Sequence, residues 1–454
     1  MLVGREKELD SMQKMFGRLF SSVVVVYGRF GMGKTALVRE FIKDKDSFYF
    51  SALPAAADEN RYFMANAVYG QSELNSYLTS YEDLFVGITK DNHVKKVIVI
   101  DEFLNIAKND PDFMESLIRM VKNQQDYGRV MVILVSSSIS QIESNKKNLF
   151  GKISNMTSFI RLEELKYMDT MRFFANYSME DCVRFYGITG GVPLYINKLN
   201  KKLSFEDNVN INILRKNSYL YETGYGEVKE ELREAAIYNT LLGCLAMGMN
   251  KINDIYNYTG FGRDKISVYL KNLIDRDLVE KVYSYDKNGK KSIKKGSYRV
   301  KPGFLTFWYK YLYPNHNALV CEDGNIFYEK YIRPTLDSEF MHEAFVNVCS
   351  EFLQVMEEHG QLSIKTEKCE RVYENDRRID IIRQDRDGNC IVGSCDFSDD
   401  KMEMNVLDRL EETINEYEVK CVATYLFSKK GFAQELRQRA DRDNNLTLIE
   451  ISDL

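Results

Sequence analysis

The chain has 454 residues, enough for about three domains with separate cores, and its formal net charge of −5 excludes a general electrostatic attraction to nucleic acid or anionic lipid. The eight cysteines form no C-x-x-C pair and the four histidines share no ligand spacing, which argues against a disulfide framework and a zinc site. Because the start lacks a signal-peptide pattern and no apolar run has the length of a membrane span, we expect a cytoplasmic protein without membrane contact.

The first predicted element is an apolar strand that ends in a glycine-rich turn. After Val23–Tyr27, the segment 28–35 reads G-R-F-G-M-G-K-T, the G-x-x-x-x-G-K-[ST] pattern of a phosphate-binding loop. Its glycines let backbone N–H groups point inward, and the helix predicted after the loop adds the positive end of its dipole. Lys34 would reach the β- and γ-phosphates of ATP, and Thr35 would hold Mg²⁺. The expected nucleotide-binding residues here are Gly28, Arg29, Phe30, Gly31, Met32, Gly33, Lys34, Thr35 and Ala36.

Four further apolar runs are predicted to be strands of a largely parallel sheet: 48–53, 97–100, 130–135 and 159–162. The run 97–100 is followed by Asp101 and Glu102, at the edge where open α/β sheets bind ligands. With Lys34 they form the predicted catalytic set, in which Asp101 contacts Mg²⁺ and Glu102 activates the attacking water. The alternative is a helix N-terminus with acids in its first turn. A second carboxylate favours hydrolysis over simple nucleotide binding.

Three serines, Ser136 to Ser138, end the strand 130–135. If this strand lies between the other two, the serine hydroxyls lie beside the γ-phosphate, and we choose Ser137 as the sensing group. The alternative is that the serines only end the strand and cap the next helix.

The segment 3–8, V-G-R-E-K-E, resembles the h-G-R-E-x-E opening of the archaeal-type ATPases, which are close to the STAND and AAA+ groups of P-loop ATPases. Further matches are Asp101-Glu102, S-S-S-I at 136–139, N-L-F-G-K at 148–152 and T-G-G-V-P at 189–193. The resemblance covers most of residues 1–200. It implies an α/β fold with strand order 5-1-4-3-2, a helical lid after the sheet, and the opening motif with Arg5 near the adenine.

One position departs from the family pattern. Lys152 stands where L-x-G-R is usual, at a position that resembles an arginine-finger site. Lysine keeps the charge and loses the planar fork that grips phosphate oxygens, so catalysis in trans is in doubt. The alternatives are that Lys152 is a solvated surface residue and that 190–193 is a plain turn between lid helices.

Residues 232–282 show the apolar periodicity of three helices, with a glycine turn at 259–262 between the second and third. Predicted strands at 278–285 and 298–301, separated by Asn288-Gly289, complete a winged helix. The segment 281–301 carries eight basic residues against the single acid Asp286: Lys281, Lys287, Lys290, Lys291, Lys294, Lys295, Arg299 and Lys301.

Two readings of this basic wing stay open. In the first, the wing contacts the phosphate backbone of DNA, with Arg263, Lys265 and Lys271 near the recognition helix. In the second, the lysines only keep a hairpin solvated, and the unit docks a protein partner. The aromatic stretch 298–309 resembles the family's Y-x-I-x-D-P-F-L-R-F-W-Y segment.

The last part begins with helical character at 326–353 and continues with predicted strands at 379–382, 390–395, 422–427 and 446–451. In family members this part resembles the PD-(D/E)XK nuclease fold. Asp380 matches that motif, whereas Gly393-Ser394-Cys395-Asp396-Phe397 stands where G-E-C-K-W is usual. Asp380 with Asp396 would still offer carboxylates to a metal, and Glu339 or Glu343 would have to replace the missing helix acid. The preferred interpretation is a retained fold without cleavage, which serves binding or assembly.

The sequence thus predicts three domains: a P-loop ATPase domain with a helical lid (1–215), a winged helix-turn-helix domain (216–315) and a nuclease-like α/β domain (316–454). The leading hypothesis is an ATP- and Mg²⁺-dependent switch that hydrolyses ATP slowly to ADP and couples the nucleotide state to the other two domains. The alternatives are a non-hydrolysing scaffold for DNA or protein and a residual metal-dependent nuclease. A phosphotransferase is disfavoured, and an oligomer is compatible with the sequence.

Overall fold

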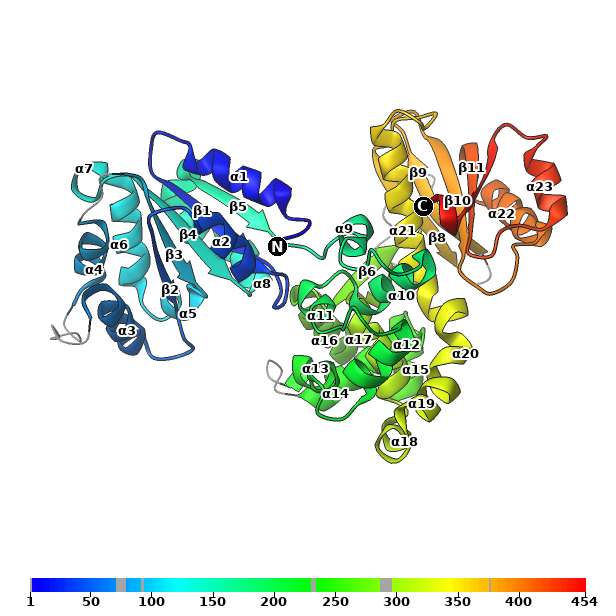
Figure 1. The fold of residues 1–454 in the computed structure, drawn as a ribbon, viewed down its shortest axis with the longest axis horizontal. Coiled ribbons are helices and arrows are strands. Elements are labelled where there is room, and N and C mark those ends of the chain that lie inside the picture. The colour runs from blue at the N-terminus through cyan, green and yellow to red at the C-terminus, as the bar shows by residue number, and fades with distance from the viewer. Residues whose placement is uncertain (1, 71–78, 91–93, 230–233, 286–295, 375–376) are drawn as a thin grey trace. The chain divides into compact units, whose positions relative to one another are not determined.

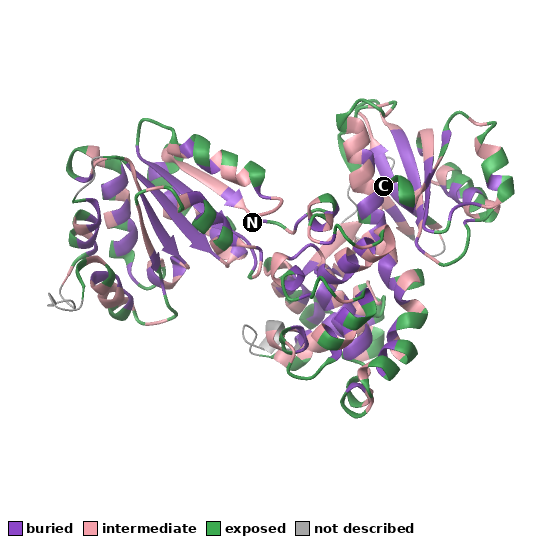
Figure 2. Ribbon diagram, viewed as in Figure 1, coloured by how far each residue is buried: buried purple, intermediate pink, exposed green. Residues whose placement is uncertain are grey.

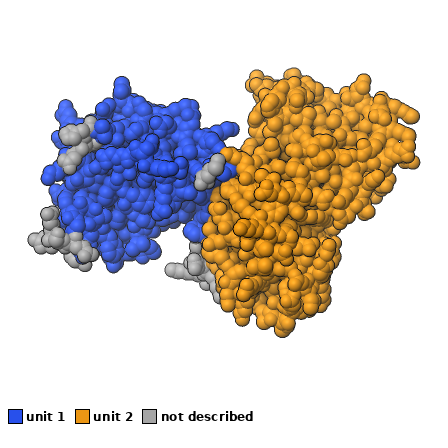
Figure 3. Space-filling model, in the orientation of Figure 1, with its two compact units in different colours: residues 1–164 blue, residues 165–454 orange. Residues whose placement is uncertain are grey.

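The computed structural model describes residues 2–70, 79–90, 94–229, 234–285, 296–374 and 377–454. The chain divides into two compact units, residues 1–164 and 165–454, which are coloured separately in Figure 3. In the described part of the chain, no helix combines the length and apolarity needed to cross a membrane.

Unit 1 is built around a five-stranded parallel sheet (Figure 1). Its strands are β1 (Ser22–Tyr27), β2 (Ser47–Ser51), β3 (Lys96–Asp101), β4 (Val130–Ser136) and β5 (Thr157–Arg161). The order is β2-β3-β4-β1-β5, so the implied order 5-1-4-3-2 is confirmed. The strand ending in the serines lies between the strand ending in the acids and the strand feeding the glycine-rich loop, as the prediction for Ser137 required.

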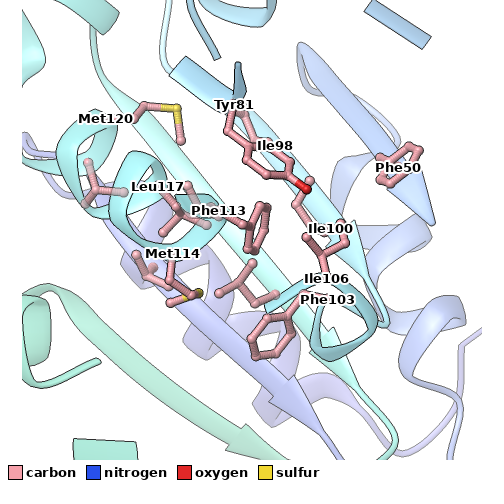
Figure 4. Close-up of a cluster of buried hydrophobic side chains, with 14 of the residues drawn as sticks. Phe50, Tyr81, Ile98, Ile100, Phe103, Ile106, Phe113, Met114, Leu117 and Met120 are labelled. Carbon is pink, nitrogen blue, oxygen red and sulfur yellow. The ribbon is translucent and has the colours of Figure 1, made fainter. Parts of the chain in front are cut away.

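Helices cover both faces of this sheet, which is why β1 and β4 are buried along their whole length (Figure 2). The helices of unit 1 are α1 (Glu6–Phe16), α2 (Lys34–Ile42), α3 (Ala57–Tyr69), α4 (Tyr81–Thr89), α5 (Leu104–Ala107), α6 (Pro111–Lys122), α7 (Gln124–Tyr127), α8 (Ile139–Phe150) and the 3-10 helix η3 (Gly151–Met156). On one face, residues of α4, α5 and α6 pack on Ile98 and Ile100 of β3 (Figure 4). In this cluster the rings of Tyr81 and Phe113 meet edge to face, with centroids 5.3 Å apart.

Unit 2 begins with helices that follow the first sheet in the chain: α9 (Tyr167–Met171), α10 (Met179–Thr189), α11 (Pro193–Ile196), α12 (Phe205–Asn208), the π-helix η4 (Val209–Leu214) and α13 (Tyr219–Lys229). The family resemblance implied that the helices directly after the first sheet form a lid on the ATPase domain. Here α10 packs on the long helix α21 (Met341–Glu358) of the same unit. Gly190, at φ 59°, ends α10, and a Cβ on it would lie 2.8 Å from the backbone nitrogen of Gly303.

Three helices and a hairpin come next: α14 (Ala235–Ala246), α15 (Ile252–Thr259), α16 (Arg263–Asp275), β6 (Val279–Tyr283) and β7 (Gly296–Val300). The two strands are antiparallel, with Val279 opposite Val300. These elements lie where the sequence periodicity predicted them. The turn at Asn288-Gly289 and five of the eight basic residues of the segment 281–301 lie outside the described residues; the five are Lys287, Lys290, Lys291, Lys294 and Lys295.

The rest of unit 2 joins a helical stretch to a second sheet. The helical elements are α17 (Gly303–Phe307), η6 (Trp308–Leu312), α18 (His316–Cys321), α19 (Gly324–Phe327), η7 (Tyr328–Ile332), α20 (Arg333–Thr335), η8 (Leu336–Phe340), α21, α22 (Met404–Glu416), α23 (Gln434–Ala440) and η9 (Ile451–Asp453). The strands are β8 (Lys368–Glu374), β9 (Arg377–Gln384), β10 (Asn389–Asp396), β11 (Lys420–Ser428) and β12 (Leu446–Glu450), in the order β12-β11-β10-β9-β8.

This second sheet is mixed: β8, β9 and β10 are antiparallel neighbours, whereas β10, β11 and β12 run parallel. The separate C-terminal α/β sheet was predicted, but its edge strand β8 was not. The three-domain division at 215/216 and 315/316 stays a prediction, because the compact units divide the described chain only at 164/165.

Candidate functional site

The glycine-rich loop joins β1 to α2 and is shaped by close backbone packing. Gly31 and Gly33 adopt φ values of 83° and 85°, a left-handed conformation that favours glycine. A Cβ on Gly28 would lie 2.5 Å from the carbonyl oxygen of Leu162, so only glycine fits against the segment that follows β5. Because α2 begins at Lys34, its unpaired N–H groups and the positive end of its dipole face the loop.

Lys34 is 6% exposed, and its ammonium lies among carbonyl oxygens of the loop. Nζ donates to the carbonyl of Gly28 at 2.8 Å and to that of Arg29 at 3.0 Å. Burial lowers the pKa of Lys34 to about 8, although the nearby Glu102 and Asp101 act in the opposite direction. The loop therefore places a partly desolvated cation where an anionic ligand would meet it.

Asp101 ends β3 with both carboxylate oxygens bound. Oδ1 accepts from the backbone N–H of Glu102 at 3.0 Å, and Oδ2 accepts from Thr35 Oγ1 at 3.1 Å. Oδ2 also accepts from the hydroxyl of Tyr49 on β2, at 2.5 Å. The structure thus brings together the two predicted Mg²⁺ ligands, Thr35 and Asp101, and adds a tyrosine that the sequence did not single out.

Glu102 and Ser137 also lie together, at the ends of the neighbouring strands β3 and β4. The Ser137 hydroxyl donates to Oε1 of Glu102, and the Ser137 backbone N–H donates to Oε2 at 3.2 Å. Glu102 has a φ of 50°, a conformation that costs a non-glycine residue about 1–3 kcal/mol. Outliers of this kind concentrate at functional sites, and here the outlier aims a carboxylate at the serine cluster.

Two arginines connect the loop to the last residues of unit 1. Arg5 donates to the carbonyl oxygens of Met32 at 3.2 Å and Glu163 at 2.6 Å. Arg29, in the loop itself, forms an ion pair with Glu164 at 2.6 Å, and both side chains are mostly buried. Arg5 is therefore beside the loop, and its place near the adenine, which the resemblance implied, stays a prediction. Glu164 was missed, because nothing in its local sequence distinguishes it from Glu163.

The other predicted loop residues differ in exposure. Met32 is buried, whereas the Phe30 side chain is 70% exposed and Ala36 lies exposed in the first turn of α2. Lys152, at the predicted arginine-finger position, lies exposed in η3. Within unit 1, Phe30 and Lys152 are thus surface residues, and their predicted roles are not tested by these contacts.

The side chains and backbone amides of this site fit a magnesium-bound nucleotide. The hydroxyl of Thr35 and the carboxylate of Asp101 are hard oxygen ligands of the kind that Mg²⁺ prefers, and they are already within hydrogen-bonding distance of each other. The backbone amides of the loop, the start of α2 and the Lys34 ammonium supply the donors and positive charge for phosphate oxygens.

In the C-terminal sheet, both carboxylate oxygens of Asp380 already bind neighbouring residues. This 1% exposed residue accepts from the backbone N–H of Cys395 at 2.9 Å and pairs with His342 at 3.0 Å and Arg378 at 2.5 Å. Burial alone would raise the pKa of Asp380, but these partners outweigh it and lower the pKa to about 2.

The other carboxylates considered for a metal are also engaged elsewhere. Asp396 accepts from the backbone and hydroxyl of Ser398, Glu339 pairs with Lys310, and Glu343 pairs with Arg299 and Arg371. Among the described residues, no three His, Cys, Asp or Glu side chains gather as a metal site. The pairing of Asp380 with Asp396 as metal ligands therefore finds no support.

The hairpin β6–β7 is attached to this sheet on the turn side of β6 and through β7. The Tyr285 backbone N–H donates to the Arg371 carbonyl of β8 at 2.7 Å, and Arg299 of β7 pairs with Glu280 and Glu343. Lys301 pairs with Asp277. Two of the described basic residues of the segment 281–301 are thus neutralised within the protein, whereas Arg263, Lys265 and Lys271 of α16 are exposed.

Comparison of the sequence with known proteins shows which families it matches. Residues 2–199 match a family described as an ATPase domain predominantly from Archaea, and residues 308–408 match one described as Archaea bacterial proteins of unknown function. An uncharacterized protein of Methanocaldococcus jannaschii is 30% identical over 387 residues, 84% of this chain and 84% of that protein.

Among solved structures, the Walker-type ATPase of Pyrococcus abyssi has a TM-score of 0.51 at 12% identity, covering 68% of this chain and 96% of that chain, a likeness of fold alone. The ORC2 protein of Aeropyrum pernix has a TM-score of 0.49 at 14% identity, covering 70% and 95%. The chain has the phosphate-binding loop and the strand order described above, and its relative is similar over 84% of both chains. It therefore belongs to the archaeal-type ATPase family, with a P-loop, ATP-binding domain followed by a C-terminal domain of unknown function.

Proposed function

We propose that the protein is a Mg²⁺-dependent switch ATPase that binds ATP tightly, hydrolyses it slowly and uses the nucleotide state to change the arrangement of its second unit. The observation that carries the proposal is the meeting of Lys34, Thr35, Asp101 and Glu102 at the carboxyl edge of one parallel sheet. Bound Mg²⁺ would neutralise phosphate charge, and the residues around it would orient the nucleotide and a water molecule.

Glu102 is the residue best placed to activate that water, since it follows the predicted magnesium ligand Asp101 directly. Both of its carboxylate oxygens accept hydrogen bonds from Ser137, so the carboxylate is held in one orientation. Release of this restraint would have to precede proton abstraction, which supports slow turnover.

The switch part of the proposal is supported by the ties between the loop and residues 163–164. Arg29 pairs with Glu164, the last residue of unit 1, and Arg5 binds both the loop and the carbonyl of Glu163. A γ-phosphate that attracts Arg29 or moves Met32 would change contacts at the exact point where the chain leaves the ATPase unit. A ligand shifts a conformational equilibrium only through such differential contacts.

Substitution Glu102→Gln tests the hydrolytic role. It keeps the shape of the side chain and removes the base, so we expect ATP binding within about threefold of wild type and loss of phosphate release by roughly 100-fold or more. The matched control is Glu115→Gln on α6 of the same unit, which is exposed. If the wild type binds ATP and releases no phosphate, the protein is a nucleotide-bound scaffold, the alternative function.

We further propose that α14–α16 with the hairpin β6–β7 form a winged helix that contacts the DNA backbone through α16. The exposed Arg263, Lys265 and Lys271 support this, and the attachment of the hairpin to the C-terminal sheet would hold α16 in place. With about three phosphate contacts, log K should fall with log salt at a slope near −2.7. A filter-binding titration of the full chain tests this. Absence of binding at low salt would favour a protein partner instead.

For the C-terminal sheet, we propose a nuclease-like fold that binds or assembles without cleaving. Support comes from Asp380, whose charge is compensated by His342 and Arg378, and from Asp396, which is engaged by Ser398. Incubation of supercoiled plasmid with the full chain and Mn²⁺ should give no nicking. Nicking that Asp380→Ala abolishes would establish the residual nuclease.

A further inference from the structure

Tyr49 lies on β2, the strand beside β3, and its hydroxyl contacts the carboxylate at the end of β3. Its hydroxyl donates to Oδ2 of Asp101 at 2.5 Å, the same oxygen that accepts from Thr35 Oγ1 at 3.1 Å. The backbone register explains the reach, because Ser51 lies directly opposite Asp101 and Tyr49 is two residues earlier on the same face of the strand. A tyrosine is long enough to span that offset, whereas a serine or threonine at 49 would not be.

The ring of Tyr49 also contacts a residue of α2. The guanidinium of Arg39, on α2, lies 6.0 Å from the ring centroid, and the residue is only partly accessible. A phenol hydroxyl is protonated at neutral pH, so Tyr49 acts as the donor in this hydrogen bond. Asp101 therefore has a fixed donor on each oxygen: the Glu102 backbone N–H on Oδ1 and the Tyr49 hydroxyl on Oδ2.

We propose that Tyr49 is a positioning residue for divalent-cation binding, one that fixes the Asp101 carboxylate in the rotamer that faces Thr35. The inference rests on the proposed Mg²⁺-dependent function and extends it to a residue outside the phosphate loop and the acidic pair. The oxygen that Thr35 approaches is held by a rigid aromatic donor, so that an incoming cation meets a carboxylate already oriented. Partners that orient a metal ligand typically contribute 10- to 100-fold to metal affinity.

Tyr49→Phe removes only the hydroxyl and keeps the ring in its place. We expect the free Mg²⁺ concentration that half-saturates the tight binding of an ATP analogue to rise about tenfold, while binding of the analogue in excess EDTA stays at the wild-type value. Tyr69→Phe is the matched control. Tyr69 is on α3 of the same unit and donates to the carbonyl of Asp83 at 2.8 Å, away from the site, and its removal should leave both measurements unchanged.

The measurement is fluorescence titration of a labelled, slowly hydrolysed ATP analogue against the full chain at a series of buffered Mg²⁺ concentrations. Thermal unfolding of each variant accompanies it. In an Asp101→Asn background, the further substitution Tyr49→Phe should have no effect on the Mg²⁺ requirement, because the carboxylate it orients is gone. Non-additivity of this kind would not arise if Tyr49 only supported the sheet.

Three results would overturn the inference: an unchanged Mg²⁺ requirement in Tyr49→Phe, an equal loss of binding with and without Mg²⁺, or full additivity with Asp101→Asn. In each of these the wild type still binds the analogue with Mg²⁺, so the proposed function stands. If the wild type binds no analogue at any Mg²⁺ concentration, the proposed function fails, and this inference fails with it.

Discussion

The pairing of Asp380 with His342 and Arg378 predicts a pH-dependent contribution to the stability of unit 2. The folded-state pKa of Asp380 is about 2, against about 3.9 for an unfolded aspartate. A difference of about 1.9 pKa units corresponds to roughly 2–3 kcal/mol. Because the folded pKa is the lower one, this stability is fully present above about pH 5 and is lost as the pH falls toward 2.

Asp380→Asn abolishes the charge and should destabilise unit 2 by about 2–3 kcal/mol at pH 7, and by progressively less between pH 5 and pH 2.5. The assay is urea unfolding followed by the fluorescence of Trp308, which is the only tryptophan of the chain and is buried in unit 2. Asp387→Asn, in the exposed turn between β9 and β10, is the control. It should change the free energy of unfolding by less than about 0.5 kcal/mol throughout the same pH range.

A difference between Asp380→Asn and wild type that is below about 0.5 kcal/mol at pH 7 would refute this reasoning. So would a difference that stays constant from pH 7 to pH 3, since a constant cost would reflect packing and not the ionisation of Asp380.

Two further predictions concern unit 1. Ser137→Ala removes the hydroxyl that restrains Glu102, so phosphate release should rise up to about tenfold in a single-turnover assay, the equivalent of one hydrogen bond of about 1.4 kcal/mol; an unchanged or lower rate would favour the sensing role instead. Glu164→Gln weakens the tie to Arg29, so ATP-dependent hydrogen-exchange protection of residues 162–166 should decrease, whereas Glu163→Gln, an exposed neighbour, should retain it. Equal protection in both variants would contradict the proposed coupling.

The features that the sequence predicted correctly are those that depend on residues close together in the chain. The apolar run before Gly28 and the run before Asp101 are strands because only full burial on both faces accommodates four consecutive β-branched residues. The order of the strands came from the family resemblance, since hydrophobic periodicity alone does not say which strands are neighbours.

What the sequence did not show depends on contacts between distant segments. Tyr49 is 52 residues from Asp101, and its role depends on the register of β2 against β3. His342 is 38 residues from Asp380, and it closes a site that the motif comparison alone left open to a metal. The strand β8 was missed because charged residues alternate with few apolar ones along Lys368–Glu374, as suits a strand at the edge of a sheet.

The most direct test of the whole account is calorimetric titration of Mg·ATP into the purified full chain, with Lys34→Ala as the comparison. The buried ammonium of Lys34 and the amides of the loop should bind one nucleotide per chain, and the truncation should weaken binding by at least about 100-fold, the cost of a charge-assisted contact of roughly 3 kcal/mol. No heat of binding in the wild type, or the same affinity in Lys34→Ala, would contradict the assignment of the loop as the nucleotide site.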